Sequence, residues 1–501
     1  MVAVRLKYLQ RRIDIVSLAL LTLVIARALV ACLSTPIAAY ANNYDFVRQS
    51  SCVGVWQDYG GKEKTLNNPE RPVNNLIVDG DVRPEVCLRS SDNIVPWLVA
   101  HLAGRGAHIE LREIGFVKIV ILEGLLLSIF AQPIYPIARL AFMVSAYALL
   151  GDIAVLSYFD TLYLDASAIM FCFASIVFAV AVWCRTRPPN TATLGTLLFV
   201  VAWLTCSKQQ YAPYAAFICL VGLFGFLRRW RSKGLAITGL AGLVMIQALY
   251  FGAFSSSNEH TRQIRKANLS DTFLEAVLPA APDKPKALSI LGLPQTCMPA
   301  IGLNWYHPPI ENGELCPEVF LLHRSSLIRL FTAFPQTFVL PMLHAATYNR
   351  PFYLSIIGHF ERPADVDRLR FRFLFLTSLS TWLDAIPDNI YLIYVIGLTL
   401  LGAISFVVIL RRQIHRDYVS SASDTQWLLY GCSGTLAFYA VGSAVFGDGY
   451  GDLQRHCVGI FIATACAIGG LVFTFGLGRR KTADRPAYVV SLPGRRIDKP
   501  T

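Results

Sequence analysis

The chain has 501 residues, of which 54% are hydrophobic and only 16% are charged, and its mean hydropathy is +0.48. This composition excludes an ordinary water-soluble globule, because the apolar residues form long blocks separated by short charged clusters. The net charge of +12 does not indicate nucleic-acid binding, since the basic residues gather at the ends of the apolar blocks. We therefore predict an all-α, polytopic membrane protein.

The apolar blocks predict the membrane-spanning elements. Each block is close to the length that an α-helix needs to cross the hydrocarbon, so roughly 10–12 transmembrane helices are expected. The expected spans are residues 13–40, 114–131, 134–157, 164–184, 191–207, 210–227, 234–254, 326–345, 371–386, 390–410, 426–446 and 456–477. If 326–345 and 371–386 are re-entrant or interfacial, two spans are lost and both termini still lie on the same side.

At the end of the first block, Ala39-Tyr40-Ala41 resembles a signal-peptidase site after a basic segment. A signal peptide has an apolar region of about 7–15 residues. This block is longer and contains Arg27. We therefore predict a retained helix.

Short basic clusters predict the topology. By the positive-inside rule they place both termini in the cytoplasm and the protein in the plasma (inner) membrane. The clusters are "RLKYLQRR" before the first span, 185–187, 228–233, 411–416 and 479–481. The outer side then receives two long loops, 41–113 and 255–325, and the short links 157–164, 207–210 and 447–455. Residues 1–477 form the membrane domain, and 478–501 form a basic cytoplasmic tail.

The cysteines fit this assignment. Eight of the 12 lie in or beside apolar segments, and the other four lie in the two long outer loops. Outside the cytoplasm disulfides are expected, and four cysteines allow three pairings. We favour Cys52–Cys87 and Cys297–Cys316, because each pair stays within one loop. Zinc is the alternative, but neither loop has a CxxC or CxxH spacing.

Polar residues with catalytic potential all fall on the predicted outer side, next to the membrane. Asp45 follows the first span, and Lys208 with Gln209 lies in a very short link. The link "SYFDTLYLDAS" supplies Asp160, Tyr163 and Asp165, and "FGDGYGDLQRHC" supplies Asp448, Asp452, Arg455 and His456.

Each of these features also has a purely structural explanation. A lone acid after a helix is often a solvated loop residue, a lysine at a helix end can extend its ammonium group to the interface, and "GDGYGD" is typical of a turn. Within the apolar segments, charged residues are costly and must be paired or functional. They are Arg27, Lys118, Glu123 and Arg139, and we expect Arg27 to pair with Glu123.

Acids and cations beside lipid suit sugar transfer from a polyprenyl phosphate. Such a reaction needs a base to take the proton of the acceptor hydroxyl, and cations to hold the departing phosphate. Phosphate is a good leaving group, so no strong general acid is required. The donor arrives from the bilayer and the acceptor from the aqueous space.

Four motifs resemble those of the GT-C superfamily of integral-membrane glycosyltransferases, in particular a bacterial branch of it. They are "YFDTLYLDAS", "SKQQYAP", "FYLSIIGHFERP" and "GDGYGDLQRH". The corresponding family patterns read approximately Asn-Ser-Phe-Tyr-x-Glu, Ser-Lys-x-Gln, Gly-Asn-x-Glu and Gly-Asp-Gly-x-x-Asp-x-x-(Lys/Arg)-His. The resemblance covers the order of motifs from 41 to 456 and implies a GT-C-like helix bundle with a lipid-linked donor.

The resemblance also implies roles for individual residues. Asp45 would be the general base of an inverting transfer, and Lys208 and Arg455 would hold the phosphate. Asp160, Asp165 and Glu361 would orient the sugar or coordinate a divalent metal ion, the one cofactor that it suggests. The remaining substrate-binding candidates are Tyr163, Gln209, His307, His359, Asp448, Asp452 and His456.

Three departures from the family pattern leave the substrates open. Asp160 and Asp165 replace Asn and Glu, and His359 stands where Asn is usual. The acceptor is a glycan, a lipid or a protein. We expect it to bind the long outer loops. There "NWYHPP" (304–309) is either an aromatic platform or part of the loop's own core.

Two other functions remain open at this stage. Twelve helices with both ends inside is a common transporter layout, so a flippase or transporter of a lipid-linked or anionic solute is the alternative. A non-catalytic assembly subunit would tolerate replacement of Asp45.

The sequence also leaves the side of 346–370 ambiguous, because its arginines favour the cytoplasm whereas the resemblance places His359 and Glu361 outside. We predict the outer side.

Overall fold

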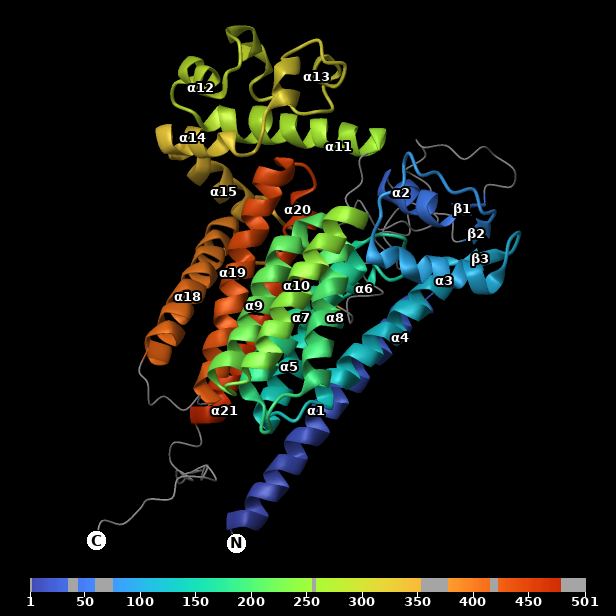
Figure 1. Cartoon of the computed structure of the whole chain (residues 1–501), viewed down its shortest axis with the longest axis vertical. Helices are drawn as coiled ribbons and strands as arrows, with labels where there is room; N and C mark the ends of the chain where they lie inside the picture. Colours follow the sequence, from blue (N-terminus) through green and yellow to red (C-terminus); the bar gives the residue numbers. More distant parts are fainter. Residues whose placement is uncertain are drawn as a thin grey trace.

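The computed structural model of the chain describes residues 2–34, 44–58, 75–254, 258–352, 377–414 and 422–478. Its described part is mostly helical, with a bundle of long helices and two smaller subdomains stacked on one end (Figure 1). We call that end the loop end. The opposite end, where α1 begins and α18 and α21 finish, is the tail end.

The bundle contains helices from the whole length of the chain. They are α1 (Val2–Cys32), α4 (Leu111–Phe130), α5 (Pro136–Leu150), α7 (Asp165–Cys184), α8 (Thr191–Ser207), α9 (Ala212–Arg228), α10 (Lys233–Leu249), α18 (Asp388–Ile414), α19 (Ala422–Asp448) and α21 (Val458–Gly478). Short helices α6 (Ile153–Leu156) and α20 (Leu453–His456) lie at the loop end.

Seven helices of the described ranges are long and apolar enough to cross a membrane, or eight if one bent pair counts as a span. This confirms a helical, multi-pass protein, with fewer qualifying spans than the 10–12 predicted. The helices that do not qualify have identifiable features: α5 and α8 are short, and α4 carries four charged residues. The predicted span 134–157 is broken between α5 and α6, where Asp152 caps α6.

Helix α7 is the centre of the bundle. All twenty of its residues are buried, and it packs against α5, α8, α9, α19 and α21. Its sequence explains this position, because a helix that is apolar on every side can be covered by neighbours all round. Several small residues allow close helix packing.

Two of the four charged residues inside the apolar helices form ion pairs. Lys118 lies 3.5 Å from Asp92, and Arg139 lies 2.5 Å from Asp14. Arg27 is buried over the Tyr147 ring, whereas Glu123 is exposed. Their predicted pairing therefore stays a prediction.

The first loop subdomain comprises the described residues 44–58 and 75–110, and it adds a small sheet to the mostly helical fold that was predicted. Strands β1 (Val55–Gln57), β2 (Asn75–Val78) and β3 (His108–Glu110) are antiparallel in the order β1-β2-β3. They pack with helices α2 (Tyr44–Val53) and α3 (Ile94–Ala103) around a separate apolar core. Three- and four-residue strands are too short for alternation to stand out in the sequence.

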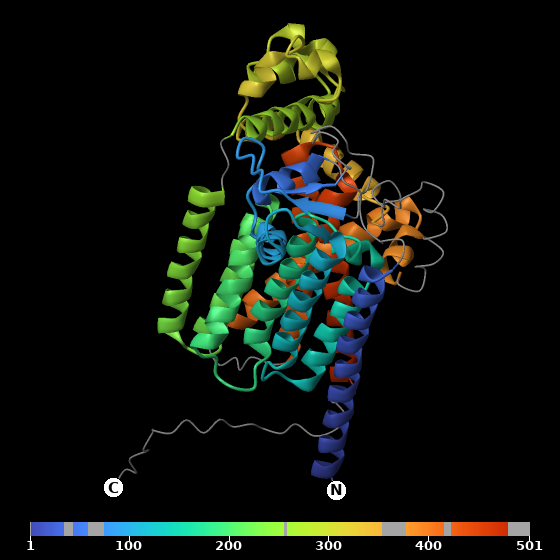
Figure 2. The ribbon, with the colours of Figure 1, turned by 90° about the vertical axis from the view of Figure 1, so that its right-hand side faces the viewer.

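The second loop subdomain covers residues 258–325 and sits above α19 and α20 (Figures 1 and 2). It contains α11 (Glu259–Ser270), the π-helical η4 (Asp271–Val277), α12 (Lys284–Leu291) and α13 (Pro308–Glu311). The two loop subdomains touch, since Arg48 Nε donates to His260 Nε2 at 2.7 Å.

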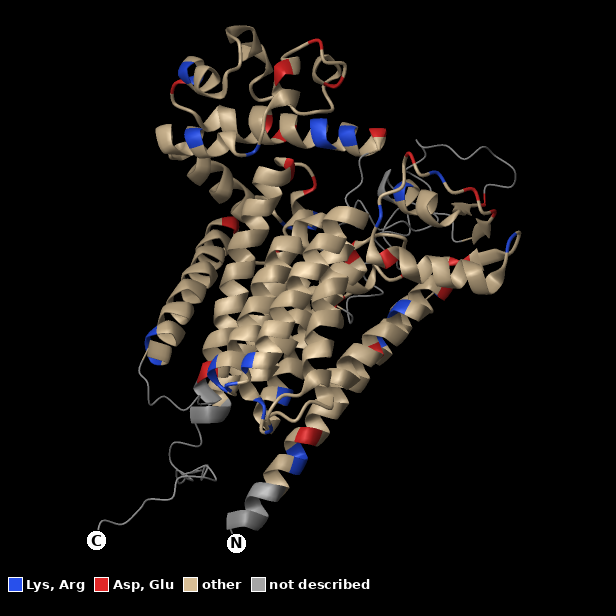
Figure 3. Cartoon of the chain, viewed as in Figure 1, with Lys and Arg blue, Asp and Glu red and all other residues tan. Residues whose placement is uncertain are grey.

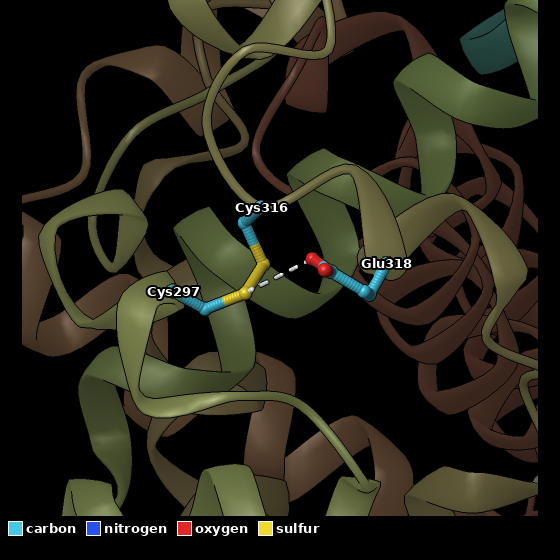
Figure 4. A group of neighbouring side chains, drawn as sticks. All are labelled: Cys297, Cys316 and Glu318. Atoms are coloured by element: carbon cyan, nitrogen blue, oxygen red, sulfur yellow. Dashed lines mark hydrogen bonds between the residues drawn. A yellow bond between two sulfur atoms is a disulfide. The ribbon is translucent and has the colours of Figure 1, made fainter.

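Both predicted disulfides are present. Cys52 pairs with Cys87 and Cys297 with Cys316, with Cα–Cα distances of 4.8 and 4.7 Å. Figure 4 shows Glu318 beside the second bond, its Oε2 3.7 Å from Cys297 Sγ. The two sulfur atoms are bonded to each other and present no thiolates, so the zinc alternative fails here.

Residues 326–345 do not form a straight span. Helices α14 (Ser326–Ala333) and α15 (Gln336–Tyr348) meet at 101°, with Pro335 at the break. The predicted span 371–386 lies partly outside the described residues, and no span is found in the part that is described. Its described part contains only the six-residue helix α17 (Leu379–Asp384).

Asp152 anchors α17 to the loop end of the bundle. Its buried carboxylate accepts hydrogen bonds from Ser378 and Ser380, including both backbone N–H groups at 2.9 and 3.0 Å. On the other flank, Arg350 donates to the carbonyls of Leu383 and Ile386. His359 and Glu361 lie outside the described residues, so their side of the membrane stays a prediction.

Charged residues lie mainly at the two ends of the bundle, and few Lys, Arg, Asp or Glu residues lie in its middle (Figure 3). The described basic clusters at 185–187, 228–233 and 411–414 all belong to the tail end, where Arg229 donates to the Arg185 carbonyl at 2.8 Å. This clustering is what the positive-inside rule expects of a cytoplasmic face. The side itself stays a prediction.

Candidate functional site

The candidate site is built around the N-terminus of α7 at the loop end. Asp165 is the first residue of α7 and almost fully buried. Its Oδ1 lies 2.9 Å from Nζ of Lys208, the residue that joins α8 to the short 3-10 helix η2 (Gln209–Tyr211). The helix dipole favours a carboxylate at this position, and the ammonium ion balances its charge. Two predicted site residues are thus direct partners.

Asp160 lies in the loop before α7, and only 1% of its surface is exposed. It faces α4 at Gly115, where a Cβ atom would stand 1.8 Å from Asp160 Oδ1. Burial raises the pKa of this carboxyl to about 7, while the Cys32 thiol and the charges of Lys118 and Arg112 hold it lower than burial alone would. The Asp160 carboxyl therefore keeps its proton to a higher pH than an exposed aspartate does.

Lys118 holds the loop that carries Asp160. Its ammonium group, on α4, donates to the Thr161 carbonyl at 2.8 Å and lies 3.5 Å from Asp92. Asp92 also accepts a hydrogen bond from the Ser167 hydroxyl on α7. Burial raises the pKa of Asp92 above its usual range, and the Lys118 charge lowers it in part.

Sequence reasoning missed Asp92 as part of this cluster. The available signal was Lys118, a lysine in an apolar helix that needed a carboxylate partner. No local pattern identified which acid that partner was.

A second group of predicted residues lies at the turn between α19 and α20. His456 Nε2 is 2.8 Å from Asp448 Oδ2, and Arg455 Nη2 is 3.3 Å from Asp452 Oδ2. The Arg455 guanidinium lies 5.9 Å from the centre of the Tyr163 ring. This contact brings the turn next to the loop before α7, so the predicted motifs meet in space.

Gln210, rather than the predicted Gln209, connects the two groups. Its Nε2 donates to the His456 carbonyl at 2.7 Å and to Ser443 Oγ at 3.0 Å. Gln209 is exposed. Adjacent residues on a helix point in different directions, which the motif alone did not resolve.

The second loop subdomain contacts this turn closely at Gly449. Gly449 has φ of +67°, and a Cβ there would lie 2.6 Å from the carbonyl carbon of Asp271. Asp271 Oδ1 accepts the Trp305 backbone N–H at 2.6 Å. Burial raises the pKa of Asp271 to about 7; the Trp305 N–H opposes the shift, and the nearby Glu275 and Asp448 add to it.

The segment 304–309 lies on the same subdomain. Trp305 packs edge-on against Phe320, with ring centroids 5.9 Å apart, which fits a role in the loop core. Tyr306 is 76% exposed, and the exposed His307 lies 2.9 Å from Asn304 Oδ1. An acceptor platform there stays a prediction.

Asp45 lies in the first turn of α2 rather than in a loop. Helix α2 contacts α3 and η1 (Ser91–Asn93), the short helix that carries Asp92. The backbone at residue 45 therefore belongs to a helix that contacts the element carrying Asp92. The described residues do not include the Asp45 side chain.

Among the described residues, Cys297, Cys316 and Glu318 are the one group of three neighbouring side chains with metal-ligating atoms, and the two cysteines form a disulfide. A divalent ion at Asp160, Asp165 or Glu361 thus stays a prediction.

Comparison with known proteins identifies a family for almost the whole chain. Residues 3–468 match the model of the YfdI N-terminal transmembrane domain. No curated protein and no solved structure matches the chain. The family match agrees with the multi-pass helical architecture, and the protein is an integral membrane protein that belongs to the YfdI N-terminal transmembrane domain family.

Proposed function

We propose that this protein is a membrane glycosyltransferase of the GT-C type, which transfers a sugar from a polyprenyl-phosphate donor to an acceptor hydroxyl. One observation carries the proposal most strongly. The Asp165–Lys208 pair and Arg455 lie together around the N-terminus of α7, at one end of the bundle and beneath two loop subdomains. Cations with carboxylates at such a boundary suit a lipid phosphate and a sugar.

The proposed reaction is a single displacement with inversion. Asp45 takes the proton of the acceptor hydroxyl, and the acceptor oxygen forms a bond to the anomeric carbon. The bond between that carbon and the phosphate oxygen breaks, and its electron pair leaves with the polyprenyl phosphate. Lys208 and Arg455 stabilise the negative charge that develops on the phosphate. Asp160 and Asp165 accept hydrogen bonds from sugar hydroxyls.

Both proposed phosphate ligands have carboxylate partners. Lys208 contacts Asp165 at 2.9 Å, and Arg455 contacts Asp452 at 3.3 Å. A donor phosphate competes with these carboxylates or shares the cations with them. The pairs keep the cations oriented until the donor arrives, which limits the ordering cost of binding.

A transporter is less well supported by the same site. Transport across the bilayer needs a polar path at depth. The central helix α7 is buried over its full length, and its sequence between Ser175 and Cys184 is entirely apolar. The charged groups of the candidate site instead gather at the loop end.

The test uses purified protein in lipid nanodiscs with a panel of radiolabelled polyprenyl-phosphate sugars and candidate acceptors. We expect transfer by the unmodified protein. Removal of a general base costs about 10²–10⁴-fold in rate, so Asp45→Asn should lose most turnover and retain donor binding. Glu85→Gln, a change of an exposed acid in the same subdomain, is the matched control and should be neutral.

Two outcomes would contradict the proposal in different ways. Wild-type turnover by Asp45→Asn would move the base to another carboxylate. Flipping of a lipid-linked sugar in sealed vesicles, without any transfer, would identify a transporter.

A further inference from the structure

Helix α3 in the first loop subdomain has an exposed face with no charged residue. Its sequence is IVPWLVAHLA, and one side, which includes Val95 and Val99, packs into the subdomain core. On the other side Trp97 is 52% exposed, Leu102 is 77% exposed and Ile94 is 48% exposed. Single exposed apolar residues are normal on a protein surface. A whole helix face of them requires a partner.

The position of α3 indicates what that partner is. The helix lies across the long axis of the bundle at the loop end, and the view in Figure 2 looks nearly along it. It packs against α4, whose Phe116 and Val120, further along that helix toward the tail end, are each 52% exposed. In a multi-pass membrane protein such a helix side faces lipid. We therefore infer that the exposed face of α3 extends the lipid-facing surface of α4 to the loop end of the bundle.

The chemistry of the face matches the boundary between lipid head groups and acyl chains. Tryptophan is enriched at this boundary, and Trp97 is stacked on His101 with ring centroids 5.3 Å apart. Arg105, exposed just beyond the end of α3, is placed to meet anionic head groups. Burying an apolar face is worth about 25 cal/mol per Å², so embedding it is favourable.

We propose that α3 is a membrane-surface helix that lies in the leaflet at the loop end, with Trp97 and Leu102 among the lipids. The inference does not depend on the proposed reaction. It does fix the depth of the candidate site, because η1 leads directly into α3. Ser90 Oγ and Ser91 Oγ of this junction donate to the carbonyls of Ser207 and Trp203, at 2.7 and 2.9 Å. These bonds tie α3 to α8 beside Lys208, so the ammonium group lies near head-group level.

The experiment places a nitroxide spin label on single introduced cysteines of the full chain in nanodiscs and compares collision with oxygen and with a water-soluble nickel complex. The test positions are Leu102→Cys and Trp97→Cys. Val82→Cys, 49% exposed in the loop after β2 of the same subdomain, is the aqueous control, and Val244→Cys, 63% exposed on α10, is the lipid control. The signal of labelled unmodified protein, in which Cys206 is partly accessible, is subtracted.

We expect both α3 labels to collide with oxygen several-fold more often, relative to nickel, than the Val82 label does, and to approach the Val244 label. Three results would overturn the proposal. Nickel accessibility equal to that of Val82 would place α3 in water. Spin–spin broadening that grows with protein density would show that a second copy covers α3. Shielding from both reagents without broadening would show that the chain itself covers it.

Discussion

The Asp165 carboxylate is almost entirely buried, and the Lys208 ammonium group 2.9 Å away balances its charge. Breaking a buried pair by removing one partner costs about 3–5 kcal/mol, because the other charge is left uncompensated. Loss of Lys208 alone would thus affect both folding and any phosphate bound there. Only a variant that neutralises both residues separates these effects.

We predict that Lys208→Ala lowers both thermal stability and donor binding, whereas the double variant Lys208→Ala with Asp165→Asn recovers most of the stability but not the binding. The reason is that the double variant leaves no unpaired buried charge, whereas it still lacks the phosphate ligand Lys208 and also the Asp165 carboxylate proposed to hold the sugar. Thermal unfolding in detergent and binding of a polyprenyl-phosphate sugar measure the two effects. Lys233→Ala, at an exposed tail-end lysine, is the control. Full donor binding by the double variant would show that Lys208 is structural.

At the scale of elements, α4 and the loop before α7 approach so closely at position 115 that any added side chain would displace Asp160. A Cβ atom there would stand 1.8 Å from Asp160 Oδ1 and 3.1 Å from Cys32 Sγ. Nothing lies within 4 Å of a Cβ built at Gly124 on the same helix. Comparing alanine substitutions at Gly115 and Gly124 therefore separates the effect of the contact with Asp160 from the effect of alanine on helix stability.

We predict that Gly115→Ala destabilises the protein by about 1–3 kcal/mol through overpacking and displaces Asp160. Gly124→Ala should be neutral or stabilising by about 0.5–1 kcal/mol, because alanine favours the helix. Thermal unfolding and sugar transfer of the two variants provide the comparison. Equal behaviour of both variants would mean that α4 moves freely away from the Asp160 loop.

The contact between the second loop subdomain and the α19–α20 turn contains a titratable group. Burial raises the pKa of Asp271 from 3.8 to about 7, so the folded protein binds this proton more tightly than the unfolded chain. The contribution of Asp271 to stability is therefore greatest at low pH, falls as pH rises from about 4 to about 7, and is constant above that range.

We predict that Asp271→Asn removes this part of the pH dependence. The amide oxygen of asparagine still accepts the Trp305 N–H, and no buried carboxylate has to ionise. The difference in thermal unfolding midpoint between the variant and the unmodified protein should grow from pH 5 to pH 7.5. Glu311→Gln, at an exposed acid of the same subdomain, should show no such trend. A constant difference for Asp271→Asn would contradict the assigned pKa.

On the scale of the whole molecule, the loop end and tail end differ in both charge and cysteine chemistry. Basic clusters gather at the tail end, whereas both disulfides belong to the loop subdomains. Both features favour a cytoplasmic tail end and an oxidising environment at the loop end. The two indications come from different residues and can be tested together.

We predict that a membrane-impermeant maleimide labels a cysteine introduced at the exposed Glu314 in intact cells, and labels one at the exposed Lys233 only after permeabilisation. The same cells, alkylated before lysis, should yield non-reduced peptides that join Cys52 to Cys87 and Cys297 to Cys316. Labelling of Lys233→Cys from outside, or free thiols at all four cysteines, would contradict the predicted topology.

The sequence by itself determined the class of protein and most of the long helices. Helices α7, α9, α10, α18, α19 and α21 begin and end within a few residues of the predicted spans. A spanning helix satisfies its backbone hydrogen bonds internally, so hydropathy along the chain is enough to find it. The disulfide pairs were also predictable, because each joins cysteines within one loop.

Only the tertiary structure decided which polar residues meet. Lys118 with Asp92, Asp160 with Gly115, and His456 with Gln210 are contacts between residues far apart in the chain. The bend between α14 and α15 and the small sheet likewise depend on what packs against them. Local propensity and hydropathy do not encode such partners, since these contacts depend on the distances and burial that arise when α4, α7, α8 and α19 pack together.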